Sequence, residues 1–223
     1  MRLYIVGTDK WNGNVNQQKA QIPAGVVAGD LILVFWHRSG GTTNAGNEDN
    51  GFTSLDSGSG TSLGFRCLYK IAADSSEAGT LVNLCHFGSG SDNAISLTIV
   101  IRGWTGTPVS SGYGASASAD STADPPNCTS GWGVTTTLWL AWAGCNNAAS
   151  VPASSPPSGY TELISETRTS CSADLFYKIS TAASDNPGTL TWASGTPNEG
   201  TLTVAIRSGT PRGVVNHQNP GIF

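Results

Sequence analysis

The chain has 223 residues, of which only 12 % are charged, and its formal net charge is −4. Non-specific nucleic-acid binding needs clustered Lys and Arg, and the absence of any basic run excludes this class. No apolar stretch reaches the roughly 18 residues of a membrane span, and the apolar run that begins at Leu3 is too short for a signal peptide. The 28 glycines and many Ser and Thr residues suit strands and tight turns better than surface helices.

In chain order, the hydrophobic pattern predicts strands. Two continuous apolar runs, 30–37 and 137–143, are typical of strands buried on both faces. Residues 72–78 indicate a turn or a single helical turn. Four segments alternate apolar and polar residues, which predicts antiparallel strands with one face on a core: 65–71, 95–102, 173–179 and 202–207. In 95–102 we expect Ile95, Leu97, Ile99 and Ile101 to face inward and Ser96, Thr98, Val100 and Arg102 to face outward.

Short sequences recur in the same order in the two halves of the chain. Leu68-Tyr69-Lys70-Ile71 returns as Phe176-Tyr177-Lys178-Ile179, 108 positions later, and Gly51-Phe52-Thr53 returns as Gly159-Tyr160-Thr161 at the same offset. Later matches, such as Gly79-Thr80-Leu81 with Gly188-Thr189-Leu190, drift by a few positions, as loop-length changes between equivalent strands would cause. The pattern predicts an internal repeat.

Together these patterns predict an all-β fold, an antiparallel β-sandwich that is jelly-roll-like and built from two internally repeated halves. We expect a single unit over 1–223, with related halves at about 20–108 and 133–211. The Ser/Ala/Gly/Pro-rich segment 105–131 is either a flexible linker or a surface crossover within one sandwich. Two tandem small β-sandwiches are the alternative.

Several turn and strand-end segments resemble signatures of tailed-bacteriophage virion proteins over roughly residues 20–210. They are the Pro23-Ala24-Gly25 turn with the Gly29-Asp30 pair, Tyr69-Lys70-Ile71-Ala72, Ile101-Arg102-Gly103 and Pro157-Ser158-Gly159-Tyr160-Thr161. In the third segment Ile101 stands where that family usually has Tyr. The resemblance carries over no catalytic residue.

The resemblance implies a non-enzymatic structural protein of the virion, assembled in the bacterial host cytoplasm. It would be a capsid decoration or cement protein, a head fibre or a tail-fibre module. Its partners would be other capsid or tail proteins and further copies of itself, for example as a trimer on a symmetric axis.

The residues that could carry chemistry form no catalytic or metal-binding pattern. Gly60-Thr61-Ser62-Leu63-Gly64 matches a nucleophile elbow, but the strand pattern after it favours a hairpin turn. Glu162 and Glu166 are expected on one strand face, about 13 Å apart, which is too far for a glycosidase pair. The histidines, His37, His86 and His217, lack metal-ligand spacing. We expect no cofactor and no metal.

The five cysteines are expected to be free thiols, because their number is odd and they show no close pairing. They are Cys67, Cys85, Cys128, Cys145 and Cys171. Cys67 and Cys85 are in segments that could be neighbouring strands, so a bond between them is the alternative.

Tryptophan gives the best candidates for a contact surface. Trp36, Trp139 and Trp142 lie in the apolar runs and are expected in the core. Trp11, Trp104 and Trp132 fall in expected loops or strand ends, and Phe223 stands on a polar tail. Exposed Trp can bind a protein or stack on a sugar ring, so the alternative function is a module at a fibre tip that binds a host surface glycan.

Overall fold

The computed structural model describes residues 2–15, 17–40, 45–47, 50–60, 63–87, 92–116, 121–146, 153, 155–193 and 198–209. Regular structure in this part of the chain is almost entirely antiparallel β-strand, which confirms the all-β class. The one helical element among these residues is a short 3-10 turn, η1 (Ser75–Glu77), within the segment where the sequence predicts a turn or a single helical turn.

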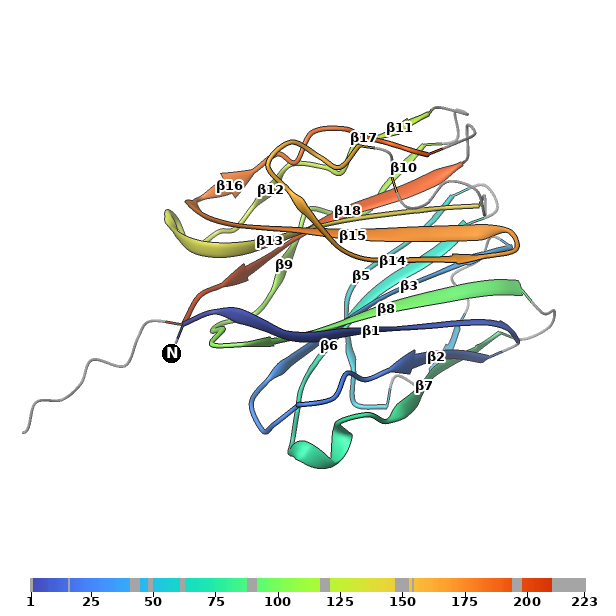
Figure 1. The fold of residues 1–223 in the computed structure, drawn as a ribbon, viewed down its shortest axis with the longest axis horizontal. Coiled ribbons are helices and arrows are strands. Elements are labelled where there is room, and N and C mark those ends of the chain that lie inside the picture. The colour runs from blue at the N-terminus through green and yellow to red at the C-terminus, as the bar shows by residue number, and fades with distance from the viewer. Residues whose placement is uncertain are drawn as a thin grey trace, which may run out of the picture.

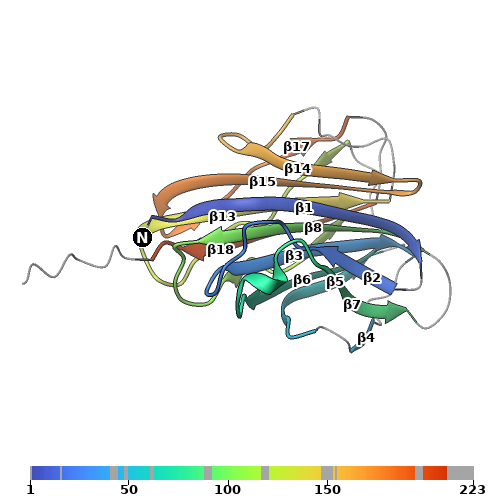
Figure 2. The same cartoon turned by 60° about the horizontal axis from the view of Figure 1, so that its bottom comes forward.

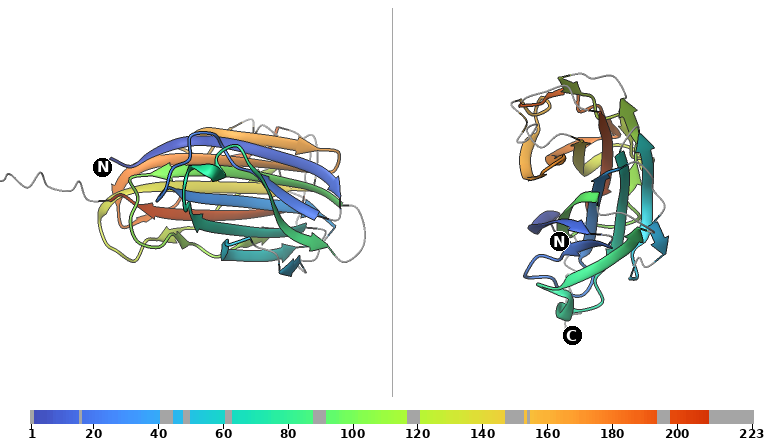
Figure 3. Two further views of the ribbon diagram at one scale, coloured as in Figure 1. Left: turned by 90° about the horizontal axis from the view of Figure 1, so that it is seen from below. Right: turned by 90° about the vertical axis from the view of Figure 1, so that its right-hand side faces the viewer.

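Two main sheets lie face to face and form a sandwich (Figure 1). The first sheet has the strand order β1 (Tyr4–Val15), β8 (Asp92–Arg102), β3 (Leu31–Ser39), β6 (Leu63–Ile71) and β5 (Thr53–Gly60). The second sheet has the order β10 (Gly114–Ser116), β18 (Glu199–Arg207), β13 (Thr135–Cys145), β15 (Cys171–Ala182) and β14 (Thr161–Arg168), with β9 (Val109–Ser110) also paired to β18. The main strands run side by side along the sandwich (Figure 3, left).

Shorter strands cover the outer faces of both main sheets. Against the first sheet lies the sheet formed by β2 (Gln17–Gln21), β7 (Leu81–Phe87) and β4 (Ala45–Asn47), which comes forward in Figure 2. The second sheet is covered by two small ribbons, β11 (Thr122–Ala123) with β17 (Leu190–Thr191) and β12 (Cys128–Thr129) with β16 (Ser184–Asp185). The molecule therefore has four layers rather than two.

Because of the covering layers, the outer faces of the main sheets are less exposed than the sequence pattern predicts. Ser96, Thr98 and Val100 point away from the central core as predicted, yet all three are buried. The Ser96 hydroxyl donates to the Lys19 carbonyl of the covering layer at 2.6 Å. The sequence pattern of β8 shows which side chains leave the central core, but it does not show that β2 and β7 cover them.

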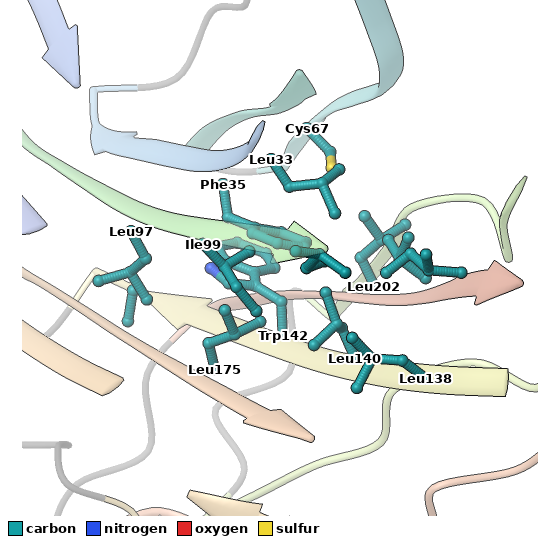
Figure 4. Packing of buried hydrophobic residues seen from close by; sticks show 14 of the residues in the cluster. Leu33, Phe35, Cys67, Leu97, Ile99, Leu138, Leu140, Trp142, Leu175 and Leu202 are labelled. Atoms are coloured by element: carbon teal, nitrogen blue, oxygen red, sulfur yellow. The ribbon is translucent and has the colours of Figure 1, made fainter. Parts of the chain in front are cut away.

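The central core draws on both main sheets (Figure 4). Leu33 and Leu97 from the first sheet share one cluster with Leu140 and Leu202 from the second. The predicted double burial of the two apolar runs is confirmed, because β3 and β13 are buried on both faces. Trp142 points into the central cluster, whereas Trp36 and Trp139 pack in the outer clusters. The shared core favours a single unit, which stays a prediction.

The two main sheets repeat one arrangement. The order β8-β3-β6-β5 in the first matches β18-β13-β15-β14 in the second. Leu33 pairs with Tyr69 as Leu140 pairs with Tyr177, and each sheet has a β-bulge two residues into its hairpin strand, after Ser54 and after Glu162. Each half keeps its main strands in one sheet, so the chain path differs from the Greek keys of a jelly roll. Descent of both halves from one copied segment stays a prediction.

Each half also holds one lysine between a carboxylate and an aromatic ring. The two sets are separated by 108 positions at every member: Lys70 with Glu77 and Phe52, and Lys178 with Asp185 and Tyr160. In both sets the ammonium nitrogen lies 5.3 Å from the ring centroid. The contact network agrees with the repeat that the short sequence matches predict.

The segment 105–131 contributes to the sandwich and is not a flexible linker in its described part. It supplies β9, β10, β11 and β12. Its Tyr113 ring stacks on Phe65 at a centroid distance of 5.2 Å, and Phe65 stacks on Trp142 at 4.2 Å. A Cβ at Gly58 or Gly200 would overlap the Tyr113 ring, so glycine is required at both positions. Tyr113 thus fills the space between β5 and β18.

We expect Tyr113→Ala to lower the free energy of unfolding by about 2–3 kcal/mol, because it empties this space and removes the ring from Phe65. Tyr113→Phe is the matched control and should be near neutral, since the Tyr113 hydroxyl has no hydrogen-bond partner. Urea unfolding of the three proteins gives the comparison. Equal stability of the alanine variant and the parent would refute this role for Tyr113.

The cysteine prediction is confirmed in its main form. All five cysteines are buried, and none of them forms a disulfide bond. The alternative of a bond between Cys67 and Cys85 is wrong, because Cys67 lies in the central cluster and Cys85 in the outer cluster on the other side of the first sheet. Burial raises the pKa of the Cys67 thiol well above its usual value, so the thiol is inert.

Candidate contact surface

Arg102, the last residue of β8, ties the start of β1 to the turn before β3. Its Nε and Nη2 atoms donate to the two carboxylate oxygens of Asp30, both at 2.7 Å. Nη2 also donates to the Gly25 carbonyl at 3.0 Å, and Nη1 to the Tyr4 hydroxyl at 3.1 Å. Asp30 is buried and accepts a third bond from the Val27 amide at 3.0 Å. These bonds raise the pKa of Arg102, with Asp30 as the main cause.

Trp104 extends this network to the last described strand. Its indole Nε1 donates to the Gly29 carbonyl at 3.0 Å, and its backbone forms a β-bridge with Ser208. The Gly209 amide donates to the Gly103 carbonyl at 2.7 Å. Gly103 has a φ of 77°, and a Cβ there would overlap the Arg2 carbonyl, so this close approach requires glycine. The end of β18 is thereby held against the end of β8.

Apolar side chains are exposed around this network. We use the name Trp104 corner for Tyr4, Val27, Ile71 and Trp104. Tyr4 and Val27 are each 42 % exposed and Ile71 is 56 % exposed, while Trp104 is partly buried against the central core. Tyr4 lies opposite Arg102 on the outer face of the first sheet, whereas Ile71 lies opposite Leu31 on its inner face, so these residues mark one end of the sheet and do not form one continuous patch. The corner lies at the end of the sandwich that carries the N-terminus, on the left in Figure 1.

The second sheet adds exposed apolar side chains at the same end. Val134, just before β13, is 73 % exposed, and Ile179 of β15 is 47 % exposed. Ile179 pairs with Leu138 in the register in which Ile71 pairs with Leu31. Of the large apolar side chains that are exposed in the described part of the chain, only Leu81 lies in the covering layer. Most of the large apolar side chains that are exposed among the described residues therefore gather at this end of the sandwich.

The predicted tryptophans do not form one surface. Trp104 lies in the corner, but Trp11 lies within β1 rather than in a loop, opposite Ser96. Ser96 is six residues from Arg102 along β8, so Trp11 is about 20 Å from the corner. Trp132 packs on the outer cluster of the second sheet, and its indole donates to the Thr137 hydroxyl at 3.3 Å. Phe223 lies outside the described residues.

Tyr4, Val27 and Ile71 are contact candidates that the sequence analysis missed. Ile71 continues the alternation of its strand, so the pattern predicts an inward side chain. It does not show that the end of the strand is exposed to solvent. Val27 lies in the turn between Gly25 and Gly29 beside Val26. Val26 is buried and Val27 is exposed, and the sequence carries no signal that separates the two.

The acidic pair expected on one strand face is separated. The bulge after Glu162 shifts the register, so that Glu162 lies opposite Phe176 of the outer cluster and Glu166 opposite Ala173 of the central cluster. Glu166 instead links the two sheet edges, accepting from Lys10 at 2.8 Å and from the Asn12 amide at 2.8 Å. The prediction of one shared face is therefore wrong, and a glycosidase arrangement gains no support.

The other candidate chemistry is structural where it is described. β5 and β6 pair as an antiparallel hairpin with Gly60 opposite Leu63, which agrees with the predicted turn, although residues 61 and 62 lie outside the described set. The side chains of His86 and His217 also lie outside it. Among the described residues, no group of three or more His, Cys, Asp or Glu side chains could hold a metal ion.

Two buried groups have strongly shifted pKa values. His37, between the main sheets and edge-on to Trp142 at 5.9 Å, has no hydrogen-bond partner on either ring nitrogen. Burial lowers its pKa to about 4, and the nearby Ser172 backbone opposes this only in part. Asp174 is also buried, and desolvation raises its pKa to about 7 against one hydrogen bond from the Ala153 amide. The two groups lie on opposite faces of the second sheet, so they cannot act as an acid–base pair.

Comparison of the chain with protein-family models, with curated proteins and with solved structures gives no match. In the described part of the chain, no helix is long and apolar enough to cross a membrane.

Proposed function

We propose that this chain is a non-enzymatic structural protein of a bacteriophage virion. It would be a decoration or cement protein, or a fibre module, attached to the capsid or tail as a symmetric homo-oligomer. Its place is on the particle, and other virion proteins are its partners.

The observation that carries the proposal is the meeting of three of the resemblance segments in one corner. The Gly29-Asp30 pair binds Arg102 of the Ile101-Arg102-Gly103 segment and the end of Tyr69-Lys70-Ile71-Ala72. These segments are 30 to 70 residues apart in the chain, yet they form one hydrogen-bonded unit. Sequence signatures that are scattered by chance would have no reason to converge, so their contact supports the resemblance.

The surface of the sandwich supports attachment at one end. The apolar side chains of the Trp104 corner, Val134 and Ile179 lie at one end of long strands. The strands β3 and β13, of 9 and 11 residues, are buried on both faces and give a stiff body for holding such an end in place. Apolar side chains that are exposed together at one end are typical of protein contacts.

Quantitative mass spectrometry of purified phage particles tests the proposal. We expect the chain in particles washed at high salt, at a copy number per particle that is a multiple of the subunits in one ring or one capsid vertex. Its absence from such particles, with free protein in the lysate, would refute a structural role in the virion.

The glycan-binding alternative gains no support from the described residues. A sugar site needs aromatic faces and polar groups that converge on one place. Trp11, Trp104 and Trp132 lie in three separate places, and the indole N–H groups of the last two are used within the protein. Binding to host surface polysaccharide that is lost on Trp11→Ala would revive this alternative.

A further inference from the structure

We propose that Arg207, the last residue of β18, binds a carboxylate of the virion protein to which this end of the sandwich attaches. The inference rests on the proposed function and names the chemistry of the partner surface, which is an Asp or Glu side chain beside apolar residues. It comes from a comparison of Arg207 with Arg102, which has the same place in the other half of the chain.

The two arginines end equivalent strands but have different neighbours. Arg102 and Arg207 are the last residues of β8 and β18, which hold the same place in the two main sheets. The strand register sets Asp30 beside Arg102 and Thr137 beside Arg207. Asp30 accepts two hydrogen bonds from Arg102, whereas Thr137 carries no charge. The second half therefore has the guanidinium without its carboxylate.

The Arg207 side chain is free to bind a partner. It is exposed, and within the described part of the chain it makes no hydrogen bond and no ion pair. A guanidinium presents its N–H donors in a planar fork that fits both oxygens of one carboxylate. Arg102 shows this pairing at the equivalent position, since both of its bonds to Asp30 are 2.7 Å long.

Arg207 and Trp132 lie on the same face of the second sheet. Thr137 is the cross-strand partner of Arg207, so the two side chains point to one side, and the Trp132 indole reaches the Thr137 hydroxyl at 3.3 Å. Trp132 is partly exposed, and Val134, two residues further on, is 73 % exposed. Arg and Trp are enriched among the residues that carry the binding energy of protein interfaces. The patch therefore offers one positive charge beside apolar surface.

A second copy of this chain does not supply the carboxylate through the same end. In the described part of the chain, the carboxylates at this end are already bonded within the protein: Asp30, Asp74, Glu77 and Asp185. A different virion protein is thus the partner that fits the free guanidinium.

The copy number of the chain per phage particle tests the proposal. Arg207→Glu should lower the copy number about tenfold or more, because it sets two carboxylates against each other. Arg207→Lys should fall between this variant and the parent, since it keeps the charge and loses the fork. Lys19→Glu, on the covering strand β2, makes the same charge change and should leave the copy number unchanged. Equal urea unfolding of the variants shows that a loss is one of binding.

A cross-link formed by a carbodiimide, which joins an amine directly to a carboxylate, identifies the partner. On particles that carry Arg207→Lys, we expect the amine at position 207 to couple to an Asp or Glu of a different virion protein. No cross-link, a cross-link to this same chain, or a parent-like copy number for Arg207→Glu would overturn the inference and leave the proposed function standing. Absence of the parent chain from particles would instead refute the proposed function and this inference together.

Discussion

Asp30→Ala should lower the free energy of unfolding by about 3 kcal/mol. The substitution removes the acceptor of two Arg102 hydrogen bonds and of the Val27 amide. Asp30 is 1 % exposed, so water cannot replace the lost carboxylate at the buried side of the guanidinium. The Gly25–Gly29 turn then loses its carboxylate link to β8 and keeps the hydrogen bond from Arg102 to the Gly25 carbonyl. Urea unfolding gives the magnitude, and hydrogen exchange of the turn amides locates it.

Glu166→Gln is the matched control for the Asp30 variant. It removes the charge from another ion pair, but Lys10 in that pair is about half exposed, so the loss should be below about 1 kcal/mol. Asp30→Asn keeps an acceptor for the Val27 amide and should fall between the two. If Asp30→Ala costs no more than Glu166→Gln, the corner is not held by this pair.

The stability of the Asp174→Asn variant, measured relative to the parent protein, should increase as pH rises from about 4 to about 7. In this window the folded parent keeps a proton on Asp174 that the unfolded chain, with a pKa near 3.9, has lost. The parent therefore loses stability as pH rises, by up to about 4 kcal/mol from this group. The asparagine variant lacks this loss, so the difference in unfolding free energy between variant and parent should grow across the window and level off above pH 7.

For His37→Gln, the stability of the variant relative to the parent should change with pH in the opposite direction and decrease as pH rises. The unfolded chain binds a proton at His37 below about pH 6.5, whereas the folded protein binds it only near pH 4. The parent therefore gains up to about 3 kcal/mol from this group as pH rises from about 4 to about 6.5, and the glutamine variant does not. Unfolding free energies at half-unit pH steps test both curves, since subtraction cancels all unchanged groups. If the difference in unfolding free energy between variant and parent does not change with pH, the burial of Asp174 and His37 is contradicted.

The strands of the main sheets could be predicted because their side-chain patterns are long. The nine residues of β3 and the eleven of β13 are apolar on both faces, which only a covered sheet explains. Over the second sheet, the covering strands β11, β12, β16 and β17 are two residues long and show no period, so they were not predicted. The outer side chains of β8 were assigned to an exposed face because the pairing of β2 and β7 over the first sheet was not predicted either.

The bulges and contacts between distant residues limited the prediction of the site. One extra residue after Glu162 moves every later side chain of β14 to the other face, and the sequence carries no clear signal for it. Trp104 follows a strand end and is partly exposed, as its place in the sequence indicates, while its role in a contact stays a prediction. Tyr4 and Val27 come from about 80 to 100 residues away in the chain. They are brought to this end by the pairing of β1 with β8 and by the hydrogen bonds of Arg102 and Trp104.

Cryo-electron microscopy of intact phage particles is the most direct test of the virion role. The account predicts density for the four-layered sandwich at symmetric positions on the capsid or tail, with the Trp104 corner end toward the particle and the opposite end outward. Particles whose protein shell and tail are fully traced without this chain would contradict it.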